Sequence, residues 1–186
     1  MTAASPVRTR CPAGLVAAIR TATSQHADWQ QTAGLVAAQL RGNLPLVPDL
    51  LTPAERAGDP ADYQCHVLHV EPDGSFSVTA MVWRPGQVTP IHDHVTWCVF
   101  GVLQGVEYEE LFALGADGTH LMAVGRNEGR PGEVSGFAPP GDIHRVRNIG
   151  DGVAVSLHVY GADITRLGTS VRRIYDLPVL APAGHS

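Results

Sequence analysis

The sequence has few cysteines, no excess of positive charge and no long apolar run. Its three cysteines, Cys11, Cys65 and Cys98, show no paired spacing, which argues for a reducing compartment rather than a disulfide framework. The net charge of −5 offers no basic surface for nucleic acid. No apolar stretch approaches the length of about 18 residues that indicates a membrane span. No apolar segment follows the charged start of the chain, so we expect a cytoplasmic protein.

The rest of the composition is typical of one globular domain. With 186 residues, 44% of them hydrophobic and 17% charged, the chain is long enough to bury a core. No repeat, low-complexity tract or linker divides it. We therefore expect a single domain over residues 1–186, with a helical prefix at about 11–60, a barrel at about 63–160 and a C-terminal extension at 161–186.

The period of the hydrophobic pattern changes near Tyr63. Before it, residues 12–22 and 28–41 carry apolar side chains at helical spacing, and Thr52-Pro53-Ala54-Glu55 has the form of a capping box. After it the period is two. Turn residues separate nine candidate strands, at 64–70, 75–83, 87–94, 97–103, 106–113, 119–125, 133–138, 143–149 and 153–160. This pattern predicts a mainly β jelly-roll barrel with an N-terminal helical layer, followed by a last helical turn or two within 162–174.

Two short blocks carry candidate metal ligands. His92 and His94 lie two residues apart, so in a strand they share one face while Asp93 points to the other. His144 lies in the second block, Pro139-Pro140-Gly141-Asp142-Ile143-His144, and completes the set if its strand folds back beside theirs. Three imidazoles with open positions suit Zn(II) or Fe(II), and the spacing does not choose between them.

The strand predicted at 153–160 is polar on one face only. Ser156, His158 and Tyr160 share that face, whereas valine and leucine side chains occupy the other. One interpretation is a solvated strand face. The other is a buried relay in which Ser156 and His158 hold the Tyr160 phenol beside the metal, where it donates a hydrogen bond or exchanges a proton.

The two blocks resemble the signature motifs of the cupin superfamily, whose fold is a double-stranded β-helix. Together with the Ser156-x-His158-x-Tyr160 strand they resemble the cysteine dioxygenase family of thiol dioxygenases, over about residues 63–160. The chain is more similar to the bacterial branch, which includes 3-mercaptopropionate dioxygenases. The resemblance implies an Fe(II) ion held by the three histidines, with Tyr160 as the catalytic residue beside it. It also implies that a small thiol of the 3-mercaptopropionate or cysteine type reacts with O2 to give the sulfinate.

Two positions depart from the family pattern. Cys65 stands where the family has an arginine or a glutamine that holds the substrate carboxylate, and a thiol is a weak donor. The candidates for substrate binding are therefore Gln64, Cys65, His66, Arg166, Arg172 and Arg173. Cys98 stands where animal members have a cysteine linked to the tyrosine that matches Tyr160. We expect Cys98 to pack as a small free hydrophobe, with a Cys98–Tyr160 crosslink as the alternative.

Two other functions stay open on the sequence. The three histidines would also suit a Zn(II) cupin hydrolase or isomerase. The replacement at Cys65 would permit a metal-binding cupin sensor that has no catalytic activity.

Overall fold

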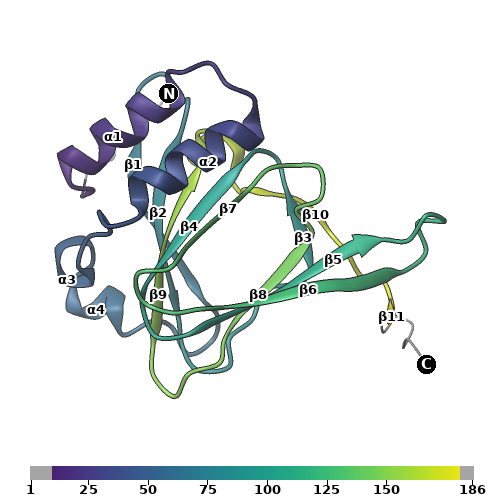
Figure 1. Ribbon diagram of the computed structural model, residues 1–186. Coiled ribbons are helices and arrows are strands. Elements are labelled where there is room, and N and C mark those ends of the chain that lie inside the picture. The colour runs from purple at the N-terminus through teal and green to yellow at the C-terminus, as the bar shows by residue number, and fades with distance from the viewer. Residues whose placement is uncertain (1–9, 181–186) are drawn as a thin grey trace, which may run out of the picture.

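The computed structural model describes residues 10–180, which form a helical layer and two curled β-sheets (Figure 1). Helix α1 (Ala13–Thr23) packs against α2 (Trp29–Leu40), and the short helices α3 (Val47–Leu50) and α4 (Pro53–Arg56) lead into the barrel. Helix α4 begins with the predicted capping box, in which Thr52 and Glu55 satisfy each other's backbone N–H groups. No helix within residues 10–180 is long and apolar enough to cross a membrane.

The two sheets form the jelly-roll barrel that the sequence predicts. The five-stranded sheet has the order β1 (Gln64–Val70), β2 (Ser77–Trp83), β9 (Ala154–Tyr160), β4 (Cys98–Gln104) and β7 (Val134–Phe137). The six-stranded sheet has the order β10 (Val171–Ile174), β3 (His92–His94), β8 (His144–Asn148), β5 (Glu107–Leu114), β6 (Leu121–Gly129) and β11 (Val179–Leu180). Helix α2 lies on β4 and β7, so the helical layer covers the outer face of the first sheet (Figure 1).

Two segments differ from the sequence-based prediction. The strand predicted at 87–94 is reduced to β3, because Pro90 cannot donate to a ladder and Val88 makes only an isolated bridge with Arg147. Within 162–174, helix α5 (Ile164–Leu167) ends at Gly168, whose φ is +80°, and the chain then forms β10. The C-terminal extension therefore belongs to the second sheet, while the division of the chain into domains stays a prediction.

Strand β9 separates the apolar core from the interior of the barrel. All of its residues are buried. Val155, Leu157 and Val159 pack into the core that α1 and α2 cover. Ser156 and the other alternate residues point into the barrel, as the period of two predicts. The helical layer thus covers the apolar side of the strand whose other side carries the polar residues.

The turn between β4 and β5 requires glycine for two reasons. Gly105 has a φ of +79°, and a Cβ there would lie 2.7 Å from the Cα of Ala154. Gly86 has a similar φ of +81°, but a Cβ there would meet no atom within 4 Å. Gly105 is needed both for its left-handed backbone and because a Cβ would overlap Ala154, whereas Gly86 is needed only for its left-handed backbone.

We expect Gly105→Ala to destabilise the protein more than Gly86→Ala does. The left-handed backbone costs a side chain about 1 kcal/mol at either position. The overlap with Ala154 should add about 1–3 kcal/mol at position 105 alone. Urea denaturation of the two variants measures the difference, and equal losses would show that β4 and β9 can move apart without cost.

Candidate metal centre

His92, His94 and His144 converge inside the barrel. Strands β3 and β8 pair antiparallel and place His92 opposite His144, and His94 follows on the same face of β3. One ligand atom from each side chain lies within 4.8 Å of the others. All three residues are buried, with exposed fractions of 6% or less. This separation is compatible with three ligands that share one metal ion.

The imidazoles of β3 are oriented by acceptors at Nδ1. The carbonyl of Pro90 lies 3.0 Å from Nδ1 of His92, and a carboxylate oxygen of Asp142 lies 3.2 Å from Nδ1 of His94. Asp142 also accepts from the backbone N–H of His94 at 2.8 Å. Because a carbonyl or carboxylate oxygen only accepts, Nδ1 carries the proton and Nε2 keeps its lone pair for a metal.

Glu109 is the acceptor at Nδ1 of the third histidine, His144. The sequence analysis did not identify this residue. Its Oε1 lies 2.7 Å from Nδ1 of His144, and Asn127 donates to its other oxygen at 2.9 Å. The available signal was the strand period, which places Glu107 and Glu109 on one face of β5. An acidic pair on the inward face of a barrel strand needs a partner or a proton.

Electrostatics favours the neutral form of the two histidines on β3. The pKa of His92 is lowered to about 3, chiefly by burial and in addition by the neighbouring His144 and His94. Burial also lowers the pKa of His94. Burial, the largest single influence, would raise the pKa of Glu109, but the interactions with His144 and the hydrogen bond from Asn127 together outweigh it, and the pKa of Glu109 is lowered. Neutral nitrogen donors backed by carboxylates fit a divalent metal ion.

Asp93 points away from this centre, as its place between two ligands predicts. It is 1% exposed, and its Oδ2 accepts from Arg172 at 2.6 Å, from Arg173 at 2.8 Å and from the hydroxyl of Tyr175 at 2.9 Å. These bonds tie β10 to β3 directly behind the histidines. Asp93 thus holds the guanidinium groups of Arg172 and Arg173, and substrate binding by either arginine stays a prediction.

A cavity of about 170 Å³ opens onto the three histidines. Among the residues predicted to bind substrate, Cys65 lines it, and Gln64, His66 and Arg166 do not. Gln64 and His66 neighbour Cys65 in β1 and so point to the opposite face of the strand. None of the arginines within residues 10–180 lines this cavity.

Ser156, His158 and Tyr160 form a hydrogen-bonded line that ends in this cavity. Oγ of Ser156 lies 2.9 Å from Nε2 of His158, and the hydroxyl of Tyr160 lies 3.3 Å from Nδ1 of His158. All three residues are buried, so the interpretation as a solvated strand face is wrong. Burial lowers the pKa of His158 to about 3 and raises the pKa of Tyr160 well above its ordinary value. His158 is therefore neutral, and Tyr160 keeps its proton.

Cys98 lies beside this line. It pairs with Tyr160 across β4 and β9, and its Sγ lies 3.9 Å from Nδ1 of His158. It is 1% exposed, and burial raises the pKa of its thiol well above the ordinary value. Both free packing of Cys98 and a Cys98–Tyr160 crosslink are compatible with this register, and each stays a prediction.

The curled sheets and the buried three-histidine cluster define a metal-binding cupin. The model of the family described as cysteine dioxygenase type I matches residues 58–168, which is more than half of the chain and includes the three histidines and residues 156–160. The chain therefore belongs to the cysteine dioxygenase type I family.

Similar solved structures include an oxalate oxidase in complex with glycolate and the cupin domain of Cnp3 from Schizosaccharomyces pombe. The first is 20% identical, with a TM-score of 0.46, and the match covers 57% of this chain and 54% of that one. The second is 16% identical, with a TM-score of 0.43, and the match covers 57% of this chain and 65% of that one. The match thus spans little more than half the length of the oxalate oxidase, and likenesses of this size concern the fold alone.

We expect the protein to bind about one metal ion per chain, and His144→Ala to lose nearly all of it. Glu109→Gln should bind the metal about 10–100-fold more weakly, because His144 loses its charged acceptor. Glu110→Gln is the matched control, since Glu110 lies next in β5 but binds Arg145 at 2.8 Å. Elemental analysis and metal titration of the stripped protein measure these effects. Full occupancy in His144→Ala would contradict a three-histidine centre.

Proposed function

We propose that this protein is an Fe(II)-dependent thiol dioxygenase that converts a small thiol and O2 to the sulfinate. The observation that supports this most is the buried line of Ser156, His158 and Tyr160, which ends beside three histidines in a chain of the cysteine dioxygenase type I family. Iron held by these histidines would supply the redox chemistry that couples O2 to a thiolate.

The reaction balances without another reductant. Both atoms of O2 are added to sulfur, which gives up four electrons, and the proton of the thiol is released when the sulfinic acid ionises. The protein has to exclude water, hold the thiol and place hydrogen-bond donors. The largely apolar walls of the cavity suit the first of these tasks.

The carboxylates around the centre argue against the hydrolase or isomerase alternative. Such an enzyme needs a general base in the cavity. Glu109 and Asp142 instead bind Nδ1 behind the histidines. Within residues 10–180, the cavity has no acidic side chain in its walls. A sensor without activity would have no use for the relay that orients Tyr160.

Tyr160 is the donor in this proposal. Because burial raises the pKa of Tyr160, the group faces the cavity as a phenol and not as a phenolate. A phenol donates a hydrogen bond to an oxygen atom that gains negative charge during the reaction. His158 restrains the ring, and Ser156 restrains His158. We therefore propose that Tyr160 acts as a donor, although the sequence is compatible with either a donor or an acceptor.

We expect Tyr160→Phe to slow turnover about 10- to 1000-fold, because one positioned donor is lost while metal binding is kept. His158→Ala should act in the same direction, since it frees the phenol. Tyr63→Phe is the control, because Tyr63 also lines the cavity but stacks on Trp83 at a ring distance of 4.6 Å, a contact that Phe retains. Oxygen uptake with saturating thiol measures turnover. A Tyr160→Phe enzyme as fast as the wild type would show that the relay is only structural.

The substrate binds without a cationic anchor in this proposal. Cys65 occupies the place of the family's carboxylate-binding residue, and none of the described arginines lines the cavity. We propose that sulfur provides most of the binding. Hydroxyls of Thr169 and Ser170 are polar groups that remain for the other end of the thiol. Free cysteine is then a poorer substrate than 3-mercaptopropionate, because its ammonium group meets no carboxylate.

We expect Cys65→Arg to raise kcat/KM for 3-mercaptopropionate about tenfold or more, because a charged hydrogen bond to a carboxylate contributes about 1.5–3 kcal/mol. The methyl ester of the same thiol should gain nothing, since it has no charge to bind. Cys65→Ser is the size-matched control. The test is to measure kcat/KM of the wild type and of each variant with 3-mercaptopropionate and with its methyl ester. An equal gain for both thiols, or a wild-type preference for cysteine, would contradict an unanchored carboxylate.

A further inference from the structure

The C-terminal extension forms one wall of the metal cavity. Residues 168–171, which we call the wall segment, all line this cavity of about 170 Å³. The segment runs from the end of helix α5 to the first residue of β10, which lies beside β3 (Figure 1). Its position therefore helps to determine how much room the cavity offers.

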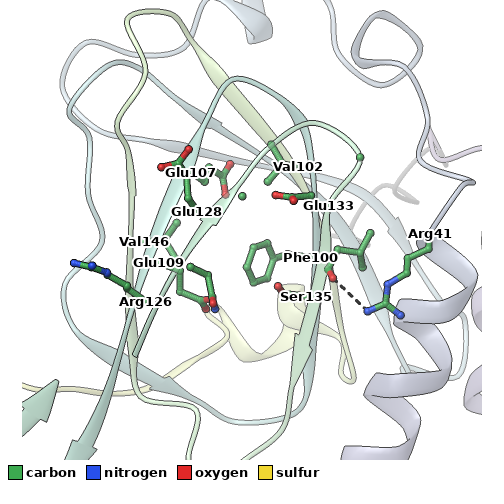
Figure 2. Close-up of a pocket in the computed structure, with 14 residues that line it drawn as sticks. Arg41, Phe100, Val102, Glu107, Glu109, Arg126, Glu128, Glu133, Ser135 and Val146 are labelled. Atoms are coloured by element: carbon green, nitrogen blue, oxygen red, sulfur yellow. Dashed lines mark hydrogen bonds between the residues drawn. The ribbon is translucent and has the colours of Figure 1, made fainter. Parts of the chain in front are cut away.

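The contribution of the extension is specific to this cavity. A second cavity, of about 560 Å³, lies elsewhere in the barrel (Figure 2). The two cavities share only Val146 among the residues that line them. The second cavity takes no lining residue from 161–180. A change in the position of the wall segment should thus alter the metal cavity and leave the other one as it is.

Two backbone hydrogen bonds attach the wall segment and β10 to the chain around β3. The N–H of Val95 donates to the carbonyl of Ser170 at 3.0 Å, and the N–H of Tyr175 donates to the carbonyl of Ile91 at 2.9 Å. Val95 and Ile91 are the residues that directly flank β3. The two bonds therefore bracket the strand that carries two of the three histidines.

A bulge in β10 brings two arginines to one carboxylate. Val171 pairs with His94 and Arg173 pairs with Asp93, so the register shifts and Arg172 is the extra residue. In a regular strand, the side chains of two consecutive residues point to opposite faces. Here both guanidinium groups donate to Oδ2 of Asp93, at 2.6 Å and 2.8 Å. The irregularity thus builds a site for the carboxylate.

The contacts of Asp93 with Arg172, Arg173 and Tyr175, which we call the Asp93 clamp, have a buried centre. The side chain of Asp93 is 1% exposed, whereas the two arginines are about half exposed. The hydroxyl of Tyr175 adds a third donor at 2.9 Å. Charged hydrogen bonds to a buried acceptor are stronger than those of an exposed ion pair. None of these three donors lines the metal cavity, so they influence it only through the segments they hold.

We propose that Arg172, Arg173 and Tyr175 are positioning residues that hold the wall segment in place through Asp93 and thereby restrict the metal cavity to small thiols. That a thiol occupies the cavity rests on the proposed function. The position of the wall segment is a property of the protein and is measurable without thiol or oxygen.

The first test is hydrogen exchange in the full-length, zinc-loaded protein, followed by NMR at the backbone amides of Val95 and Tyr175. Replacing both arginines, Arg172→Gln with Arg173→Gln, should speed exchange at both amides about 10- to 100-fold, because charged hydrogen bonds are lost. Unchanged exchange at both amides would overturn the proposal.

Arg145→Gln is the matched control for the double variant. It removes another ion pair of the same sheet, in which Arg145 binds Glu110 at 2.8 Å. Exchange at Val95 and Tyr175 should stay as slow as in the wild type. Equal acceleration in the control and in the double variant would contradict a specific role of the Asp93 clamp.

Tyr175→Phe keeps the proposal testable if the double variant folds poorly. It retains the aromatic ring and removes only the hydroxyl that donates to Asp93. Exchange at Val95 should become about threefold to tenfold faster, since one hydrogen bond is lost. A well-folded Tyr175→Phe protein that exchanges as slowly as the wild type would count against the proposal.

The second test is steady-state kinetics of the active enzyme. In the double variant, KM for 3-mercaptopropionate should rise about tenfold with kcat nearly unchanged, because a loose wall weakens substrate and transition-state binding alike. The preference in kcat/KM for this thiol over the longer 6-mercaptohexanoate should fall about tenfold. Arg145→Gln should match the wild type. Loss of the metal in place of these changes, or an unaltered KM and preference, would show that the Asp93 clamp serves only the fold and would overturn the proposal.

The two proposals fail separately. Faster exchange at Val95 and Tyr175 in a protein that oxidises no thiol would refute the proposed function and leave the role of the Asp93 clamp standing. Thiol oxidation by the wild type, with unchanged exchange in the double variant, would do the reverse.

Discussion

The pairing of β3 with β8 is the contact on which the metal centre depends. The ladder itself is short and matches His92 with His144. It needs support from both sides. Thr89 exchanges backbone and side-chain hydrogen bonds with Val146 just before the histidines. On the outer side, β10 pairs with β3 and the clamp on Asp93 closes over it. A short strand thus carries two ligands because its neighbours hold it in register.

Most of the buried polar side chains inside the barrel have hydrogen-bond partners. The two carboxylates behind the histidines accept from imidazole N–H groups, and Asp93 has three donors. Asn148 is equally well satisfied, since its amide donates to the carbonyls of Trp83 and Gly152 and its oxygen accepts from Gly150 N–H. Glu107 is an exception, because neither of its carboxylate oxygens has a partner among residues 10–180.

Glu107 and Glu109 lie two residues apart on the same face of β5, yet their carboxyl groups have different protonation equilibria. Both lie on the inward face of β5 and both are buried. Glu109 meets His144, so its pKa is lowered and it serves the metal ligand as an anion. Glu107 has no hydrogen-bond partner among residues 10–180, and burial raises its pKa to about 7. Glu109 therefore keeps its charge, whereas burial favours the protonated form of Glu107.

Local periodicity accounts for what the sequence by itself determined. The period of two put His92 and His94 on one face and aligned Ser156, His158 and Tyr160, because alternation is a property of the extended backbone. The capping box at Thr52 is local in the same way. The tertiary structure alone decided the contact of Glu109 with His144 and the clamp of Arg172 and Arg173 on Asp93. It also decided that no arginine within residues 10–180 lines the cavity that Cys65 lines. These contacts join strands far apart in the chain, and sheet order, which no local pattern encodes, determines which side chains meet.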